Sequence, residues 1–115
     1  MAEDCIFCKI ASRKANAVIV YEDEQAMAFE DINGQAPVHL LVIPKRHVAS
    51  VQDCQEADLA LLGHLLLTCS TVARIKQLTE SGYRIVANTG SNGGQTVFHL
   101  HLHVLGGRPM AWPPG

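Results

Sequence analysis

The stretch FHLHLHVLGG, residues 98–107, decides the fold, because apolar residues alternate in it with three histidines. Alternate side chains of a β-strand point to the same face of its sheet, so this period of two predicts a strand over residues 98–105. The alternation places Leu100, Leu102 and Val104 on one face. We expect that face to pack into a hydrophobic core, with the histidines on the opposite side.

The three histidines, His99, His101 and His103, would stand about 6.5–7 Å apart along their shared face. Three imidazoles at this spacing do not easily close on one metal ion, because a zinc ligand nitrogen lies about 2.0–2.1 Å from the ion. Two of them could hold an ion or contact a phosphate group. So much imidazole in strict alternation is unusual for a plain solvent face, which makes this strand a candidate active site.

A glycine-rich loop, GSNGGQT at residues 90–96, leads directly into this strand. Glycines let the backbone approach a ligand and point N–H groups at an anion, although such loops are often plain turns. No Gly-Lys-Ser/Thr follows, so this is not a P-loop. Neutral imidazole is a nucleophile near neutral pH, and attack on phosphorus would give a covalent phosphohistidine. Acidic residues do not cluster near the histidines in sequence, so no magnesium site is evident.

Length and composition set limits on the class of protein. A chain of 115 residues with 48% hydrophobic residues suits a single domain spanning 1–115. The net charge is −2 and no basic run extends beyond Lys45-Arg46, which argues against binding to a nucleic acid backbone. The start MAEDC is no secretory signal, and we see no apolar run near the roughly 20 residues that span a bilayer. We therefore expect a cytoplasmic protein with reduced cysteines and no membrane partner.

The remaining pattern predicts an antiparallel α+β domain of five strands and one long helix. Asp53 with Glu56 resembles a capping box at the start of the helix. Its apolar residues cover a wide arc, so one side could cover the sheet and another could meet a second subunit. His64 falls between the apolar stripes, and we expect it to be exposed. The other expected elements are a helical turn over 5–11 and strands over 17–21, 26–29, 38–43, 83–87 and 98–105.

The four cysteines divide into a pair and two single residues. Cys5 and Cys8 form a C-x-x-C motif, which alone is ambiguous among zinc binding, redox activity and chance. The βαβ context of a thioredoxin-like redox motif is absent, and a zinc site would need two further ligands. Cys54 and Cys69 are expected to be a loop thiol and a core residue.

Longer motifs give a more specific prediction. His-x-His-x-His followed by Gly-Gly resembles the histidine triad (HIT) superfamily, and the ending LGGRPMAWPPG resembles its nucleotide-binding (HINT) branch. The stretches QAPVHLLVIPKRH at 35–47 and GYRIVANTGSNGGQTVFHLHLHVLGG at 82–107 agree. The resemblance implies a homodimer whose two five-stranded sheets join into one of ten strands. It also implies hydrolysis of purine nucleoside 5′-phosphoramidates, such as AMP or GMP linked to amines including lysine, and of aminoacyl-adenylate-like compounds.

The same resemblance assigns roles to five residues. His101 would be the nucleophile that takes up the nucleoside monophosphate, and His103 would contact the phosphate oxygens. His39 and His99 would orient His101 and tune its protonation. Thr96 stands where the family usually has serine, beside the phosphate and the leaving group. Its hydroxyl is retained, and the added methyl group could alter rate or leaving-group preference.

The resemblance also implies a nucleotide pocket. Asp31 matches the residue that binds the ribose hydroxyls, although a turn acid before Asn33-Gly34 is the simpler interpretation of its position. The residues matching the lining of the base and ribose pocket, which could otherwise all be core, are Ile6, Phe7, Ile10, Phe29, Ile32 and Leu41. Those matching positions around the phosphate are Asn88, Gly94, Gln95 and Val97, and Trp112 matches a tail residue near the mouth of the dimer's active site.

Some relatives of this kind bind zinc, and the resemblance implies the two missing ligands. Cys5 and Cys8 would be joined by His47 and by His99. Two thiolates and two imidazoles form a closed tetrahedral site of the structural type. Such an ion would tie the N-terminal turn to the histidine strand and would not be required for the chemistry. No organic cofactor is implied.

Four alternatives remain beside the phosphoramidase. A dinucleoside polyphosphate hydrolase is disfavoured by the WPPG ending, and a nucleotidyltransferase by His103, where that branch commonly has glutamine. A zinc metallohydrolase would use His99 and His101 to hold a catalytic ion. A noncatalytic, regulatory nucleotide-binding protein is disfavoured by the complete histidine set.

Overall fold

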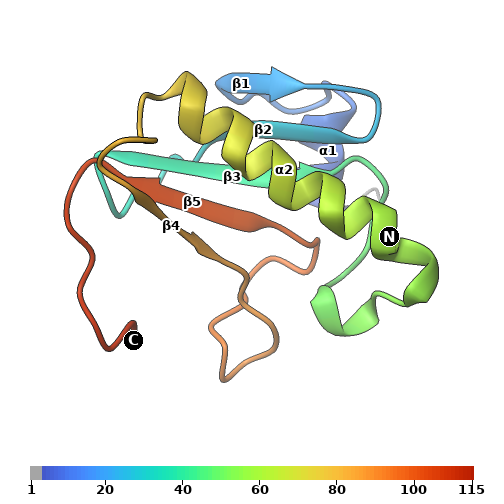
Figure 1. Cartoon of the computed structure of the whole chain (residues 1–115). Coiled ribbons are helices and arrows are strands. Elements are labelled where there is room, and N and C mark those ends of the chain that lie inside the picture. Colours follow the sequence, from blue (N-terminus) through green and yellow to red (C-terminus); the bar gives the residue numbers. More distant parts are fainter. Residues whose placement is uncertain (1–3) are drawn as a thin grey trace.

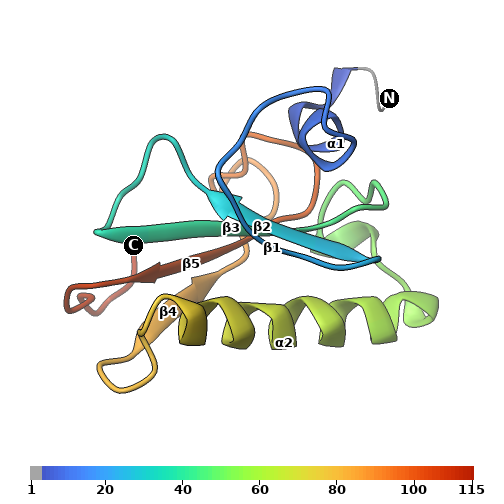
Figure 2. The ribbon, with the colours of Figure 1, turned by 90° about the horizontal axis from the view of Figure 1, so that it is seen from above.

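A computed structural model describes residues 4–115 as a five-stranded antiparallel sheet in the order β1-β2-β3-β5-β4. The helix α2 lies along one face of this sheet, and the short helix α1 lies on the other side (Figures 1 and 2). The elements in chain order are α1 (Ile6–Ala11), β1 (Ile19–Glu22), β2 (Ala26–Glu30), β3 (Val38–Pro44), the 3₁₀ turns η2 (Val51–Asp53) and η3 (Glu56–Asp58), α2 (Leu59–Ile75), β4 (Tyr83–Val86) and β5 (Leu102–Gly106). The α+β class and the five strands with one long helix are confirmed.

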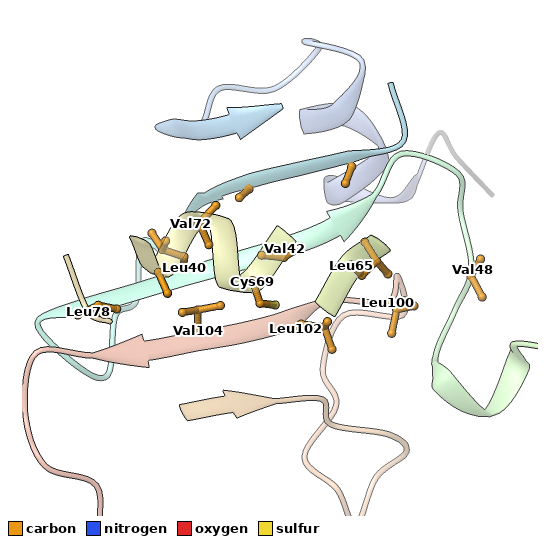
Figure 3. Close-up of a cluster of buried hydrophobic side chains, with 13 residues drawn as sticks. Leu40, Val42, Val48, Leu65, Cys69, Val72, Leu78, Leu100, Leu102 and Val104 are labelled. Atoms are coloured by element: carbon orange, nitrogen blue, oxygen red, sulfur yellow. The ribbon is translucent and has the colours of Figure 1, made fainter. Parts of the chain in front are cut away.

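The main core lies between α2 and the sheet. Figure 3 shows apolar side chains of the helix meeting those of β3 and β5. Leu100, Leu102 and Val104 all belong to this core, as the alternation predicts. Full burial of one such side chain contributes about 1.5–3 kcal/mol. The helix contributes Leu65, Cys69, Val72 and Ala73.

A smaller core lies on the opposite face, beneath α1. Strand β3 serves both faces, because Leu40 and Val42 point to α2 whereas Leu41 and Ile43 point to the smaller core. This two-sided burial explains why its sequence VHLLVIP is almost continuously apolar. His39 lies on the same side as Leu41, which is also the side of α1.

The histidine strand begins later than predicted. β5 starts at Leu102, and its pairing with β3 ends where Leu102 faces Val42. Continued pairing would oppose residue 100 to Pro44, which has no N–H to give to the ladder. The chain therefore leaves the sheet, and His99 and His101 lie in the bent segment that precedes it.

The long helix also begins later than predicted, at Leu59. The capping box is formed by Gln55 and Asp58 in the turn η3, and not by Asp53 with Glu56. The Asp53 carboxylate is used elsewhere, since it accepts a 2.8 Å hydrogen bond from the Ser50 hydroxyl. The capping box therefore belongs to the turn that precedes α2, and Asp58, the N-cap of α2 itself, makes no side-chain capping bond to the helix.

The residues Glu56–Ile75 are long and apolar enough to cross a membrane by length and composition alone, contrary to the expectation above. This is weak evidence for a membrane span, because core helices of soluble proteins meet the same criterion. In this fold one face of the helix packs on the sheet.

The expectation for His64 is wrong, because its side chain is half-buried and hydrogen-bonded. Its Nε2 lies 2.7 Å from the carboxylate of Asp23, which also accepts bonds from the Tyr21 hydroxyl and the backbone N–H groups of Gln25 and Ala26. Burial opposes ionisation of Asp23, but these hydrogen bonds outweigh it and lower the pKa of the carboxyl to about 2. The cluster ties α2 to the β1–β2 turn.

Candidate active site and metal-binding cluster

The backbone determines which tautomer the His101 ring adopts. Its Nδ1 lies 2.7 Å from the carbonyl oxygen of His99. Because a carbonyl can only accept, Nδ1 carries the proton of the neutral ring and Nε2 keeps its lone pair. The ring is buried against the edge of Phe7, with centroids 5.1 Å apart, and lines a cleft. Nε2 is therefore the ring nitrogen of His101 that is able to attack an electrophile.

His39 and His103 form a second unit whose tautomers follow from their bonds. The backbone N–H of Gln35 donates to Nδ1 of His39 at 3.0 Å, so the ring proton lies on Nε2. That nitrogen lies 2.9 Å from Nδ1 of His103, which must therefore accept. The proton of His103 is then on Nε2, and its neighbour at 3.5 Å is Nδ2 of Asn88, which is also a donor. A hydrogen bond between them therefore requires the Asn88 amide to turn its oxygen toward the ring. His103 presents an N–H that could donate to a phosphate oxygen.

Both histidines of this unit are neutral near pH 7. Burial, followed by the neighbouring rings of His101 and His39, lowers the pKa of His103 to about 4, although Asp31 opposes the shift. Burial also lowers the pKa of His39, again against the carboxylate of Asp31. The neutral forms are the ones that the donor and acceptor assignments require. In the structure His39 contacts His103, so any effect of His39 on His101 passes through that ring.

A cleft of about 720 Å³ opens above these rings, between α1 and the β2–β3 turn. His39, His101 and His103 lie on its wall. Of the residues expected to line a nucleotide pocket or contact a leaving group, the structure places these on the wall of the cleft: Ile6, Phe7, Ile10, Phe29, Asp31, Ile32, Leu41, Gly94, Thr96 and Val97.

Asp31 is a turn residue whose carboxylate also lies on the cleft. Its Oδ1 accepts a 2.8 Å bond from the backbone N–H of Asn33, as a turn residue would. Its Oδ2 lies on the cleft, 3.4 Å from Nε2 of His39. The turn therefore fixes the carboxylate beside the histidines.

Three residues expected around the nucleotide do not line the cleft. The Gln95 side chain is buried and holds the glycine-rich loop: it accepts from the N–H of Gly90 and donates to the carbonyls of Ala49 and Val97. Asn88 reaches the site through His103. Trp112 is 82% exposed in the tail and contributes nothing to the cleft of its own chain.

His99 faces away from the cleft, toward the cysteines. Its Nδ1 lies 3.2 Å from Sγ of Cys5, 3.5 Å from Sγ of Cys8 and 3.2 Å from Nδ1 of His47. All four ligand atoms lie within 4.8 Å of one another. Nε2 of His99 donates to the carbonyl of Pro44 at 2.8 Å, which orients the ring.

This set fits a zinc ion, since two sulfurs and two imidazole nitrogens are a common structural donor set. The hydrogen bond from His99 to a backbone carbonyl is the outer-shell contact that metal-ligating histidines usually make. Burial and the neighbouring Cys5 thiol raise the pKa of Cys8 to about 11, so binding must displace a proton. Both ring nitrogens of His99 are engaged elsewhere, Nδ1 in the cysteine cluster and Nε2 at the carbonyl of Pro44, which disfavours a catalytic ion held between His99 and His101.

Sequence reasoning missed five residues on the wall of the cleft. The backbone of Gln35 orients His39, a role that no side-chain motif could reveal. The others lie in the loop after α1 or beside Asp31, where polar residues normally indicate only turns. The missed residues are Asn16, Ala17, Glu30, Asn33 and Gln35.

Comparison with known proteins agrees with this geometry. Residues 12–110 match the family described as the HIT domain. An uncharacterized HIT-like protein of Synechococcus elongatus is 57% identical over 115 residues, the whole length of both chains. The crystal structure of a HIT family hydrolase from Legionella pneumophila is 50% identical, with a TM-score of 0.95 over 97% of this chain and 100% of that one. A histidine triad nucleotide-binding protein from Candida albicans is 28% identical, with a TM-score of 0.82 over 96% of this chain and 83% of that one.

Proposed function

The chain belongs to the HIT domain family, and we propose that it hydrolyses the P–N bond of purine nucleoside 5′-phosphoramidates through a nucleotidyl-His101 intermediate. The observation that carries this proposal is the 2.7 Å bond from Nδ1 of His101 to the carbonyl of His99, which leaves Nε2 free to attack. The neighbouring N–H of His103 supplies a donor for the charged phosphoryl oxygens.

The nucleoside would occupy the cleft of about 720 Å³, a volume within the usual range of about 300–1,000 Å³ for small-molecule sites. Phe7, Phe29 and Leu41 supply apolar surface for a purine ring. Asp31 would accept hydrogen bonds from the ribose hydroxyls, because its Oδ2 faces the cleft. The α-phosphate would then lie between His101 and His103.

In the first step Nε2 of His101 attacks phosphorus, and an Nε2–P bond forms. The P–N bond to the amine breaks, and the amine nitrogen keeps the bonding pair and takes up a proton from water. Such transfer depends mainly on positioning and on stabilising the charged oxygens. Thr96 lines the cleft, and its hydroxyl would contact the departing amine.

In the second step water attacks the same phosphorus. The Nε2–P bond breaks, its electron pair returns to the imidazole, and the proton lost by water leaves to solvent. The nucleoside monophosphate is released and His101 regains its starting tautomer, which the His99 carbonyl favours throughout. The chemistry needs no organic cofactor.

We also propose that Cys5, Cys8, His47 and His99 hold a structural zinc ion. An ion bound there would cross-link α1, the segment after β3 and the segment before β5. Cys5 also caps α1, since its Sγ accepts from the N–H of Cys8 at 3.3 Å. The chain's own residues carry every chemical step.

A homodimer is the assembly that we propose. Strand β4 is an edge of the sheet with Tyr83 and Ile85 partly exposed, and an unpaired edge is a site for strand or chain pairing. Leu59, Leu66 and Leu67 on α2 are more than half exposed. The exposed Trp112 would then reach the mouth of the partner's cleft.

We infer that the protein is located in the cytoplasm, because all four cysteines are free thiols. We expect neither nucleic acid nor membrane partners.

Intact-protein mass after rapid mixing with adenosine 5′-phosphoramidate tests the proposal. We expect an acid-labile adduct of one AMP per chain that is absent from His101→Ala and unaffected by EDTA. Turnover that stops with chelator would favour the metallohydrolase. Cleavage of dinucleoside polyphosphates in preference to phosphoramidates would favour the dinucleoside polyphosphate hydrolase. AMP binding without turnover of any substrate would leave a noncatalytic binding protein.

A further inference from the structure

A second cavity, of about 520 Å³, borders the catalytic cleft. The two share Ile6, Thr96 and Val97, so they meet at the residue whose hydroxyl contacts the departing amine in the proposed mechanism. The remaining walls of the second cavity are Asp4, Cys5, His47, Ala49 and Phe98.

The two cavities differ in the histidines that line them. Asp31 and His103 line only the cleft, whereas His47, which contacts His99, lines only the second cavity. A substrate with its ribose at Asp31 and its phosphorus at His101 therefore extends past Thr96 toward the second cavity. On the basis of the proposed function, we propose that this cavity binds the amine leaving group and selects it.

The walls indicate which amine would fit. Ile6 and Phe98 are 46% and 60% exposed, although their neighbours Phe7 and His99 are buried. Large apolar side chains exposed beside a cavity offer a contact surface to a ligand. Asp4 is the one acid on this wall among the described residues. The cavity thus suits an amine with an apolar stem of several carbons and a cationic group at its far end.

The test compares three adenosine 5′-phosphoramidates that differ only in the amine: ammonia, n-hexylamine and 1,6-diaminohexane. The last two match in length and differ in one terminal ammonium group. For the wild type we expect kcat/KM to be about two- to fivefold higher with diaminohexane than with hexylamine, the size of an exposed ion pair. The effect should lie in KM, because the contacts are distant from the reacting bond.

Two variants separate the apolar and charged contacts. Asp4→Asn should remove the preference for diaminohexane and leave hexylamine unchanged, whereas the exposed, distant Glu80→Gln should keep the preference. Phe98→Ala should reduce kcat/KM about three- to tenfold for both long amines, with little change for the unsubstituted phosphoramidate.

The outcomes distinguish the two proposals. Equal kcat/KM for hexylamine and diaminohexane in the wild type, or a preference that survives Asp4→Asn, would overturn the leaving-group site while the phosphoramidase stands. Failure to cleave even the unsubstituted compound would overturn the proposed function itself.

Discussion

The side chain of His101 is oriented by the main chain of His99, through a 2.7 Å contact between Nδ1 and the carbonyl oxygen. The imidazole of His99 points away, with Nδ1 toward Cys5 and Nε2 toward the carbonyl of Pro44. One residue thus serves the cleft with its backbone and the cysteine cluster with its side chain. This separation leads to different expectations for substitutions at neighbouring histidines.

His101→Ala should abolish the nucleophile. We expect kcat to fall on the order of 10³- to 10⁶-fold, as when a covalent nucleophile is removed from other hydrolases. The measurement is single-turnover hydrolysis of adenosine 5′-phosphoramidate. His64→Ala is the matched control, because that histidine lies against Asp23 and outside the cleft. Comparable loss in both variants would mean that the effect is structural.

His39→Ala should impair catalysis through His103. Without its partner at 2.9 Å, Nδ1 of His103 no longer has the donor that keeps its proton on Nε2. We expect kcat to fall about 10²-fold. Nitrogen NMR of labelled histidine should show His103 changing from one dominant tautomer to a mixture. If activity is lost while the His103 spectrum is unchanged, His39 does not act by fixing the tautomer of His103.

Acidification should destabilise the fold between pH 6.5 and about 4. The pKa of His103 falls from 6.5 to about 4 on folding, and that of His39 is also lowered. In this window the unfolded chain binds more protons than the folded chain, so the free energy of unfolding decreases as pH falls. Their stabilising contribution is complete above pH 6.5, and we expect a loss on the order of 1 kcal/mol for these partly solvated groups.

Urea unfolding at pH 7.5 and 5.0 measures this change. His103→Asn is the comparison, because an amide keeps polar contacts but does not titrate. Its unfolding free energy should vary less with pH than that of the wild type. An equal slope in both proteins would assign the pH dependence to other groups.

Removal of metal should lower stability while leaving the chemistry intact. If the cluster binds one zinc ion per chain, chelation should reduce Tm by roughly 10 °C, corresponding to a few kcal/mol of binding energy. Cys8→Ser should reproduce this loss and bind no zinc by elemental analysis. Cys54→Ser, in a half-buried position outside the cluster, should retain the ion. Phosphoramidate cleavage should persist in all three samples at a temperature where each is folded.

Packing at the end of β5 provides a stability test that is independent of the site. A Cβ at Gly106 would lie 2.7 Å from both Cδ atoms of the buried Leu78, so Gly106→Ala should lower the free energy of unfolding by about 1–3 kcal/mol.

Gly63 lies within α2, and a Cβ there would meet no other atom within 4 Å. Gly63→Ala should therefore raise the free energy of unfolding of the single chain by about 0.5–1 kcal/mol. If alanine at 63 instead weakens association, the helix face is in contact with a partner.

The alternation around the histidines predicted more than the strand boundaries did. Leu100, Leu102 and Val104 occupy the core as expected, even though β5 begins only at Leu102. The side chain of Leu100 still faces the core after the ladder has ended, so the pattern identifies the face but not the last hydrogen bond. Pro44, on the partner strand, decides where pairing stops.

The sequence patterns did not predict which distant residues contact one another in the site. The pairing of His39 with His103 joins positions 64 residues apart, and the backbone N–H of Gln35 determines its direction. Gln95 matched the phosphate region in sequence, yet it supports the loop from within. His64 lacked any local sign of its bond to Asp23, 41 residues away.

The division of labour at His99 has a consequence for how such proteins diverge. Every residue type has a backbone carbonyl, so a substitution at position 99 can abolish a metal ligand and still leave the acceptor that holds His101. The cysteine cluster and the proposed nucleophile can therefore be inherited separately. A descendant could lose the proposed ion site in one mutation, compensate through packing beneath α1, and keep the arrangement of His101 throughout.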